Sequence, residues 1–176
     1  PIACAPASFA NGSGLEACLG CVAGEYQSSP GATACEPCDA GGWCGAGASA
    51  VTLCVEGTYR NASGGANASN CVGCGAGYAC GKGAVERTAC EAGSASSYGV
   101  ACAGCVAGEF QGASAQSACE PCHEGSYCLA RATEPIACAP ASFANGSGLE
   151  ACLGCVAGEY QSSPGATACE PCDAGG

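Results

Sequence analysis

The sequence predicts a small disulfide-rich fold: an elongated tandem array of Cys-rich modules, made mostly of loops with short β-hairpins and little helix. The chain has 21 Cys and 30 Gly in 176 residues, with no Met and few large aliphatic side chains. Disulfides rather than a hydrophobic core must therefore stabilise it. Residues 135–176 also repeat residues 1–42 letter for letter, which gives a period of 134 residues. A surface that recurs at a fixed step is typical of a solenoid, a rod or a filament.

Cysteine spacing divides the chain into modules. Six Cys lie within 1–53, four within 54–89 and six within 90–134, and residues 135–176 begin the next period. Each complete module ends in Cys-x5-Cys, and nine residues always follow before the next Cys. The sequence therefore predicts three modules per period, of six, four and six Cys.

The nine-residue joints, such as 45–53 and 129–137, are the expected hinges between modules. One period holds 16 Cys, an even number, so the odd total is expected to reflect where the sequence is cut. Cys172 corresponds to Cys38, and the counterpart of that residue's partner would fall two residues past Gly176. We therefore expect an incomplete pair here and not a reactive thiol.

The spacing favours disulfides between successive Cys residues. The middle module lacks one Cys-x13-Cys stretch and still keeps an even count, as expected if those two Cys bond each other. Connectivity is not strictly deducible from sequence, and the main alternative interlaces the pairs, for example as Cys18–Cys35. The sequential scheme predicts Cys4–Cys18, Cys21–Cys35, Cys38–Cys44, Cys54–Cys71, Cys74–Cys80, Cys90–Cys102, Cys105–Cys119, Cys122–Cys128, Cys138–Cys152 and Cys155–Cys169.

Many loops open with Cys-x-x-Gly-x-aromatic, as in CVAGEY at 21–26. The Gly permits a turn with positive φ, after which the ring can fold back over the disulfide. We expect two-residue strand pairs and turns, with a helical turn at 83–90 or 129–133. Eight of the ten aromatic residues lie five positions after a Cys: Phe9, Tyr26, Trp43, Tyr59, Phe110, Tyr127, Phe143 and Tyr160.

Residues 18–38 contain Cys-x2-Cys-x13-Cys-x2-Cys, a spacing just short of that of four-thiolate zinc ribbons. Zinc is nevertheless not expected, because a metal site with four Cys ligands would leave several neighbouring Cys without partners. These are Cys4, Cys44 and Cys54. No other cofactor is expected either.

Four of the five Asn residues lie in Asn-x-Ser sequons, far more than chance would give. The sequons favour a secretory-pathway protein with N-glycans on surface loops, the alternative being that they are unused. The expected glycosylation sites are Asn11, Asn61, Asn67 and Asn145.

Charge and composition argue against several classes of partner and activity. The formal net charge is −11, with four Lys and Arg residues in total, so a polyanion such as nucleic acid would be repelled. No run of 18 apolar residues exists, so no membrane-spanning segment is expected. The lone His123 has no pattern of activating neighbours, so an enzyme is not expected.

The stretches CVAGEYQSSPGATACEPCDAGGWC at 21–44 and CVAGEFQGASAQSACEPCHEGSYC at 105–128 resemble the ephrin-receptor-like cysteine-rich repeats, and more distantly the tumour necrosis factor receptor modules. The resemblance implies rod-like, disulfide-laddered extracellular stalks. Glycosylated arrays rich in Ala and Gly look like the shafts of algal flagellar mastigonemes. Two departures are Ala7, where Gly is usual, and residues 90–102, which lack the aromatic at the fifth place.

Two functions remain open. The first is a structural protein of an extracellular glycosylated fibril, which binds further copies of itself and carries glycans. It would be secreted or lie on a cell surface, including a flagellar one, and neighbouring copies would bury exposed apolar side chains: Ile2, Leu15, Leu19 and Val51. The second is a receptor or adhesin stalk that binds a protein or glycan ligand. An unchanged duplication argues against a discriminating site and so favours the first.

Overall fold

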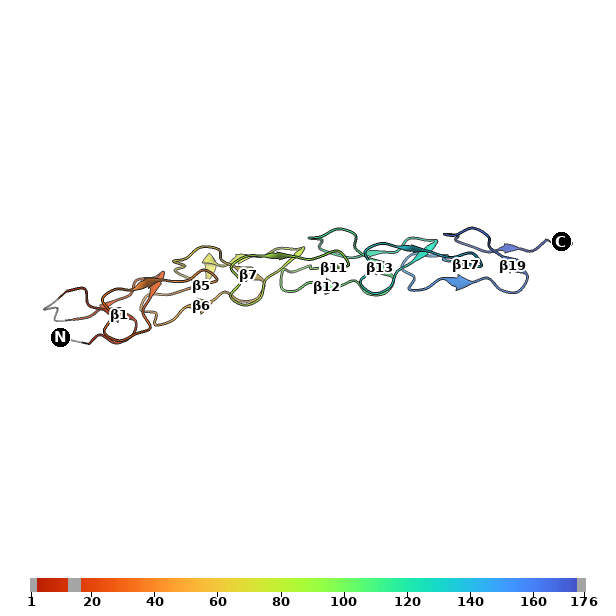
Figure 1. The fold of residues 1–176 in the computed structure, drawn as a ribbon. Helices are drawn as coiled ribbons and strands as arrows, with labels where there is room; N and C mark the ends of the chain where they lie inside the picture. The colour runs from red at the N-terminus through yellow and green to blue at the C-terminus, as the bar shows by residue number, and fades with distance from the viewer. Residues whose placement is uncertain (1–2, 13–16, 174–176) are drawn as a thin grey trace. The chain divides into compact units, whose positions relative to one another are not determined.

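The computed structural model describes residues 3–12 and 17–173. Within them the chain forms ten two-stranded sheets, each a β-hairpin of two-residue strands (Figure 1). Every hairpin begins at a Cys, which we call its opening Cys, and ends just before the next one. The hairpins span 4–20, 21–37, 38–53, 54–73, 74–89, 90–104, 105–121, 122–137, 138–154 and 155–171.

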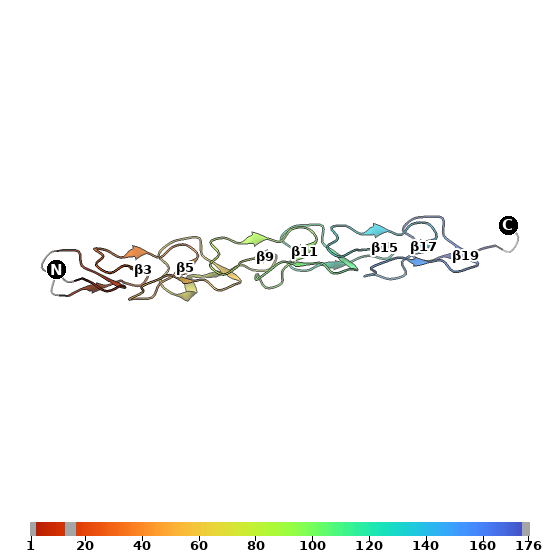
Figure 2. The same ribbon diagram turned by 60° about the horizontal axis from the view of Figure 1, so that its bottom comes forward.

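The strands pair in chain order, and Figure 2 shows how short they are relative to the loops. The pairs are β1 (Ser8–Phe9) with β2 (Leu19–Gly20), β3 (Glu25–Tyr26) with β4 (Glu36–Pro37), β5 (Gly42–Trp43) with β6 (Thr52–Leu53), β7 (Thr58–Tyr59) with β8 (Val72–Gly73), β9 (Tyr78–Ala79) with β10 (Thr88–Ala89), β11 (Ser94–Ala95) with β12 (Ala103–Gly104), β13 (Glu109–Phe110) with β14 (Glu120–Pro121), β15 (Ser126–Tyr127) with β16 (Ile136–Ala137), β17 (Ser142–Phe143) with β18 (Leu153–Gly154), and β19 (Glu159–Tyr160) with β20 (Glu170–Pro171).

A single 3₁₀ turn, η1 (Ala68–Asn70), is the helical structure of the described residues. The prediction of a helical turn at 83–90 or 129–133 is wrong. Those segments begin with turns in which Gly83 (φ 74°) and Arg131 (φ 63°) adopt the left-handed conformation, which a right-handed helix cannot contain.

The first four residues of each hairpin form the turn that leads into its first strand. The third residue after the opening Cys has positive φ, as Gly108 does at 89°, and turns the chain into the first strand. The carbonyl of Gly108 then accepts a 2.9 Å hydrogen bond from the N–H of Cys122, which opens the next hairpin. Between these points Phe110 pairs with Glu120 across the hairpin. The Cys-x-x-Gly-x-aromatic pattern therefore encodes one closed hairpin.

Ten disulfides follow one another along the chain, and each is one of the sequential pairs that the sequence predicts. Seven join the opening Cys to the residue before the second strand, as Cys105–Cys119 does at a sequence separation of 14. The other three join it to the residue after the first strand, as Cys122–Cys128 does at a separation of 6. Both types close a hairpin of nearly the same length.

The nine-residue joints belong to these hairpins. Residues 45–53 contain β6, which pairs with β5, and residues 129–137 contain β16, which pairs with β15. The prediction that the joints are hinges is therefore wrong. The physical reason is that a Cys-x5-Cys disulfide closes only the first half of its hairpin, so the second half carries no Cys and looks like a linker in the sequence.

The chain forms two compact units. One consists of residues 1–75, 79–88 and 99–101, and the other of residues 76–78, 89–98 and 102–176. Inside the first unit, hairpins also contact each other across the predicted module boundary at 53/54. There the N–H of Gly41 donates to the carbonyl of Arg60. The hairpin is therefore the repeating structural unit, and the division into modules of six, four and six Cys stays a prediction.

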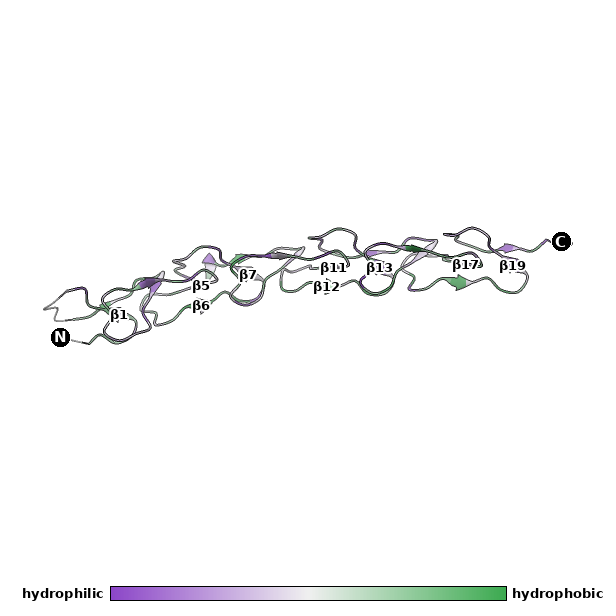
Figure 3. Cartoon of the chain, in the orientation of Figure 1, coloured by the Kyte–Doolittle hydropathy of each residue, from purple (hydrophilic) through white to green (hydrophobic). Residues whose placement is uncertain are grey.

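Cystine sulfur, not aliphatic carbon, occupies the interior. The opening Cys of nine hairpins is at most 3 % exposed, while Leu and Val side chains are prominent at the surface. Figure 3 accordingly shows hydrophilic and hydrophobic stretches mixed along the ribbon, with β19 among the hydrophilic ones. Where the aromatic is absent, in the hairpin 90–104, the buried Ala95 pairs with Ala103 in its place.

Candidate functional site: hairpin docking contacts and the sequon loop

Consecutive hairpins dock through main-chain groups. The N–H of Gly125 donates 2.9 Å to the carbonyl of Ala144 in the next hairpin. The N–H of Gly148 donates 2.7 Å in the opposite direction, to the carbonyl of the opening Cys122. The same two bonds recur between other neighbouring hairpins within each unit. Because peptide groups alone make them, the docking contact is available to any sequence that adopts the hairpin.

The second bond requires a positive φ at its donor. Gly fills this donor position in most hairpins, but Ala115 (φ 58°) and Arg131 (φ 63°) hold it in two. Similarly, Ala7 and Ala141 take the turn position that Gly occupies elsewhere, with φ of 70° and 65°. The departure at Ala7 therefore changes the residue and leaves the backbone conformation the same.

Hairpins two apart also touch. A Cβ placed on Gly24 would lie 2.9 Å from the carbonyl oxygen of Gly64, two hairpins later. A Cβ on Gly125 would meet the carbonyl oxygen of Gly165 even more closely. The Gly after an opening Cys thus serves both its own turn and the close approach of a later hairpin.

The sixth residue after the opening Cys is buried in most hairpins. It is the second cystine residue in the three hairpins with short disulfides, and Cys128, for example, is 0 % exposed. In three others it is Gln: Gln111 is 6 % exposed, donates from Nε2 to the carbonyl of Ala118 and accepts at Oε1 from the N–H of Ala113. This role is not predicted from the sequence, although Gln follows the aromatic in three hairpins.

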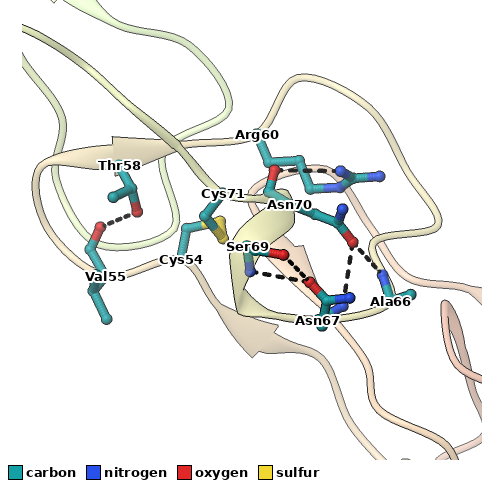
Figure 4. Close-up of a disulfide and its surroundings, with 9 residues drawn as sticks. All are labelled: Cys54, Val55, Thr58, Arg60, Ala66, Asn67, Ser69, Asn70 and Cys71. Atoms are coloured by element: carbon teal, nitrogen blue, oxygen red, sulfur yellow. Dashed lines mark hydrogen bonds between the residues drawn. A yellow bond between two sulfur atoms is a disulfide. The ribbon is translucent and has the colours of Figure 1, made fainter.

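The longest loop, 54–71, carries two of the four sequons and is shown in Figure 4. Asn67 caps η1: its Oδ1 accepts from the N–H of Ser69 at 3.1 Å and from its hydroxyl at 2.5 Å. Asn70 Oδ1 accepts from the N–H groups of Ala66 and Asn67. The two bonds from Ser69 fix the side-chain oxygen of Asn67, and the residue remains exposed.

Arg60 points to the inner side of the same loop. Its Nη2 donates 2.8 Å to the carbonyl of Ser63. Its Nη1 donates 3.4 Å to the carbonyl of Asn70, the bond drawn in Figure 4. Its Nε is buried without a hydrogen-bond partner, 2.7 Å from where a Cβ on Gly65 would stand. Arg60 therefore organises the loop interior and is not a free surface cation.

All four predicted glycosylation sites, Asn11, Asn61, Asn67 and Asn145, are exposed. Of the apolar side chains expected to pack between copies, Leu19 is 47 % exposed and Val51 is half-buried, while Ile2 and Leu15 lie outside the described residues. His123 packs edge to face against Phe110, with ring centroids 5.8 Å apart.

The Cys residues of the zinc-like motif bond in pairs. Cys18 bonds Cys4, and Cys21 bonds Cys35. Within the described part of the chain, no group of three or more His, Cys, Asp or Glu side chains is placed to hold a metal ion. Cys172 is a free, exposed thiol.

Comparisons with models of protein families and with the curated proteins found no match for this chain. No helix formed by residues 3–12 and 17–173 has the length and apolarity that crossing a bilayer requires.

Proposed function

We propose that this chain is part of a structural protein: an extracellular glycosylated fibril built from tandem 134-residue, disulfide-laddered repeats. Ten disulfides stabilise a chain with little aliphatic interior, and such bonds persist in oxidising surroundings outside the cytosol. The proposed partners are further copies of the same repeat, and the proposed modification is N-glycosylation.

One observation carries the proposal: the docking contact uses main-chain atoms and recurs unchanged after one period. The N–H of Ala7 donates to the carbonyl of Gln27 at 2.7 Å, and the N–H of Ala141 donates to that of Gln161 at the same distance. An interface that depends on backbone conformation can be repeated for any number of hairpins, as in solenoid proteins. A binding protein would instead be expected to vary its repeats around a discriminating site.

The proposed role is mechanical. Each disulfide-closed loop lowers the entropy of the unfolded chain and so stabilises the fold, by about 3 kcal/mol for a loop of 15 residues. Because the loop is closed covalently, a stretching force cannot extend the hairpin fully without breaking a disulfide. The net charge of −11 and exposed sequons would keep neighbouring fibrils hydrated and apart. The resemblance to ephrin-receptor-like stalks and mastigoneme shafts, and a place on a cell or flagellar surface, belong to this proposal.

Electron microscopy of native material, labelled with an antibody raised against the unique loop 54–71, tests it. We expect long filaments labelled at a constant axial step, which collapse when a reductant opens the disulfides. Short isolated particles that bind a protein or glycan saturably would overturn the fibril and favour a receptor or adhesin stalk. An antibody that decorates the cytosol would overturn the location.

A further inference from the structure

The three hairpins with a predicted glycan two residues after the aromatic share an exposed apolar surface. In three hairpins the aromatic pairs across the strands with an aliphatic residue: Phe9 with Leu19, Tyr59 with Val72, and Phe143 with Leu153. These aliphatic partners are 47 %, 56 % and 45 % exposed. The same three hairpins carry a sequon Asn two residues after the aromatic: Asn11, Asn61 and Asn145.

Three other hairpins lack both features: the aliphatic partner of the aromatic and the Asn two residues after it. There the aromatic pairs with a carboxylate: Tyr26 with Glu36, Phe110 with Glu120, and Tyr160 with Glu170. The position two residues after the aromatic is Ser28, Gly112 or Ser162. In the hairpin 122–137 the pair Tyr127–Ile136 is apolar again, and the exposed Leu129 stands at that position. Where the aromatic pairs with an aliphatic residue, the position two residues after the aromatic thus holds a sequon Asn or an apolar side chain.

Strand geometry places the aromatic and the Asn on one face. Alternate side chains of an extended chain point to the same side, and the residue between points to the other. The intervening residue is Ala144 in one hairpin, 0 % exposed, and Arg60 in another, whose guanidinium turns into the loop. Phe143 and Tyr59 are half-buried and Asn145 and Asn61 are exposed, so a chain that continues in the extended conformation carries each ring and its Asn on the same side.

We propose that the first N-acetylglucosamine of the glycans on Asn11, Asn61 and Asn145 stacks on this aromatic–aliphatic platform of its own hairpin. This inference rests on the proposed glycosylation. One face of the β-linked sugar ring presents only C–H groups, which carry a partial positive charge and suit the negative face of an aromatic ring. Covering the platform also removes exposed apolar area from water.

The fourth sequon supplies an internal control. Asn67 lies in the same loop as Asn61, but Gly65 stands two residues before it and offers no ring. Its side-chain oxygen is already fixed by Ser69. A glycan on Asn67 should therefore project into solvent and contribute little to the hairpin.

The test uses the whole chain, secreted from a host that adds N-glycans, with the glycans trimmed to one N-acetylglucosamine. Intact mass and glycopeptide analysis first establish occupancy. NMR should then show contacts from the ring protons of Tyr59 to the sugar on Asn61, with upfield-shifted sugar protons, and none for the sugar on Asn67.

A double-mutant cycle of Tyr59→Ala and Asn61→Gln measures the coupling through hydrogen exchange of the Cys74 amide, which closes this hairpin onto Gly57. The glycan on Asn61 should slow exchange about five-fold, the factor that corresponds to 1 kcal/mol, and only when Tyr59 is present. The matched cycle with Asn67→Gln should show no coupling. Occupied sites without ring contacts or coupling would overturn the platform alone. Empty sites at Asn11, Asn61 and Asn145 would overturn the proposed N-glycosylation together with it.

Discussion

The amide N–H of Gly165 donates a 2.8 Å hydrogen bond to the carbonyl oxygen of Cys138, which opens the preceding hairpin. One period earlier, Gly31 bonds Cys4 in the same way at 2.7 Å, and both Gly residues have a φ of 74°. The bond needs its donor residue in the left-handed conformation. A residue other than Gly loses folding free energy when it adopts that conformation. Docking between hairpins is therefore sensitive to single substitutions at this position.

Ala115→Gly should stabilise the chain by about 1 kcal/mol. Ala115 holds the docking position with φ 58° and donates 2.7 Å to Cys90, so Gly removes the strain and keeps the bond. Chemical denaturation with intact disulfides, together with hydrogen exchange of the residue 115 amide, measures the gain. Ala113→Gly, in the same loop without a positive φ, should stabilise nothing. A loss of stability in Ala115→Gly would contradict the role assigned to φ.

Gly125→Ala should destabilise the chain more than Gly47→Ala. Both residues have positive φ, 79° and 68°, so each substitution costs about 1–2 kcal/mol in backbone strain. A Cβ on Gly125 would also collide with the carbonyl of Gly165, whereas one on Gly47 meets nothing within 4 Å. The difference between the two denaturation midpoints isolates the contact between hairpins two apart. Equal effects would show that this contact contributes nothing.

Gln111→Ala should cost about 1–3 kcal/mol. The substitution leaves the carbonyl of Ala118 and the N–H of Ala113 without their side-chain partners in a partly buried loop. Thermal denaturation at fixed redox conditions measures the loss. Gln116→Ala removes a surface hydrogen bond to Ser114 and should change stability by about 0.5 kcal/mol or less. Equal losses in both variants would place Gln111 outside the hairpin interior.

The Tyr160 hydroxyl donates 3.0 Å to Glu170, and this hydrogen bond, together with the nearby negative charge, raises the pKa of Tyr160 above 10.0. The neutral phenol is the form that the fold favours. The stability that this hydrogen bond contributes is therefore present below the pKa that Tyr160 has in the unfolded chain. It is lost as the pH rises through the higher pKa of Tyr160 in the folded chain. Phenolate absorbance should titrate later in the native chain than in Glu170→Gln. Coincident curves would exclude the interaction.

The covalent and local features could be predicted from the sequence because they depend on neighbours along the chain. Cys pairs such as Cys21–Cys35 lie within one loop, so spacing alone favours them, and two-residue strands follow from Gly and Pro punctuation. The hinge prediction for 45–53 failed because a hairpin arm without Cys resembles a linker. The interior role of Gln111 was missed because Gln is ordinarily a surface residue.

Sequence by itself determined the 134-residue period and the positions of the turns, and its Cys spacing favoured the sequential disulfides, since these features depend on exact repetition, on Gly and on Cys. Only the tertiary structure decided that the N–H of Gly165 reaches the carbonyl of Cys138 and that Gly125 makes room for Gly165 two hairpins later. The physical reason is that every residue carries the same peptide groups. Contacts made by the main chain leave no mark of residue type except where a left-handed φ or a close approach favours Gly.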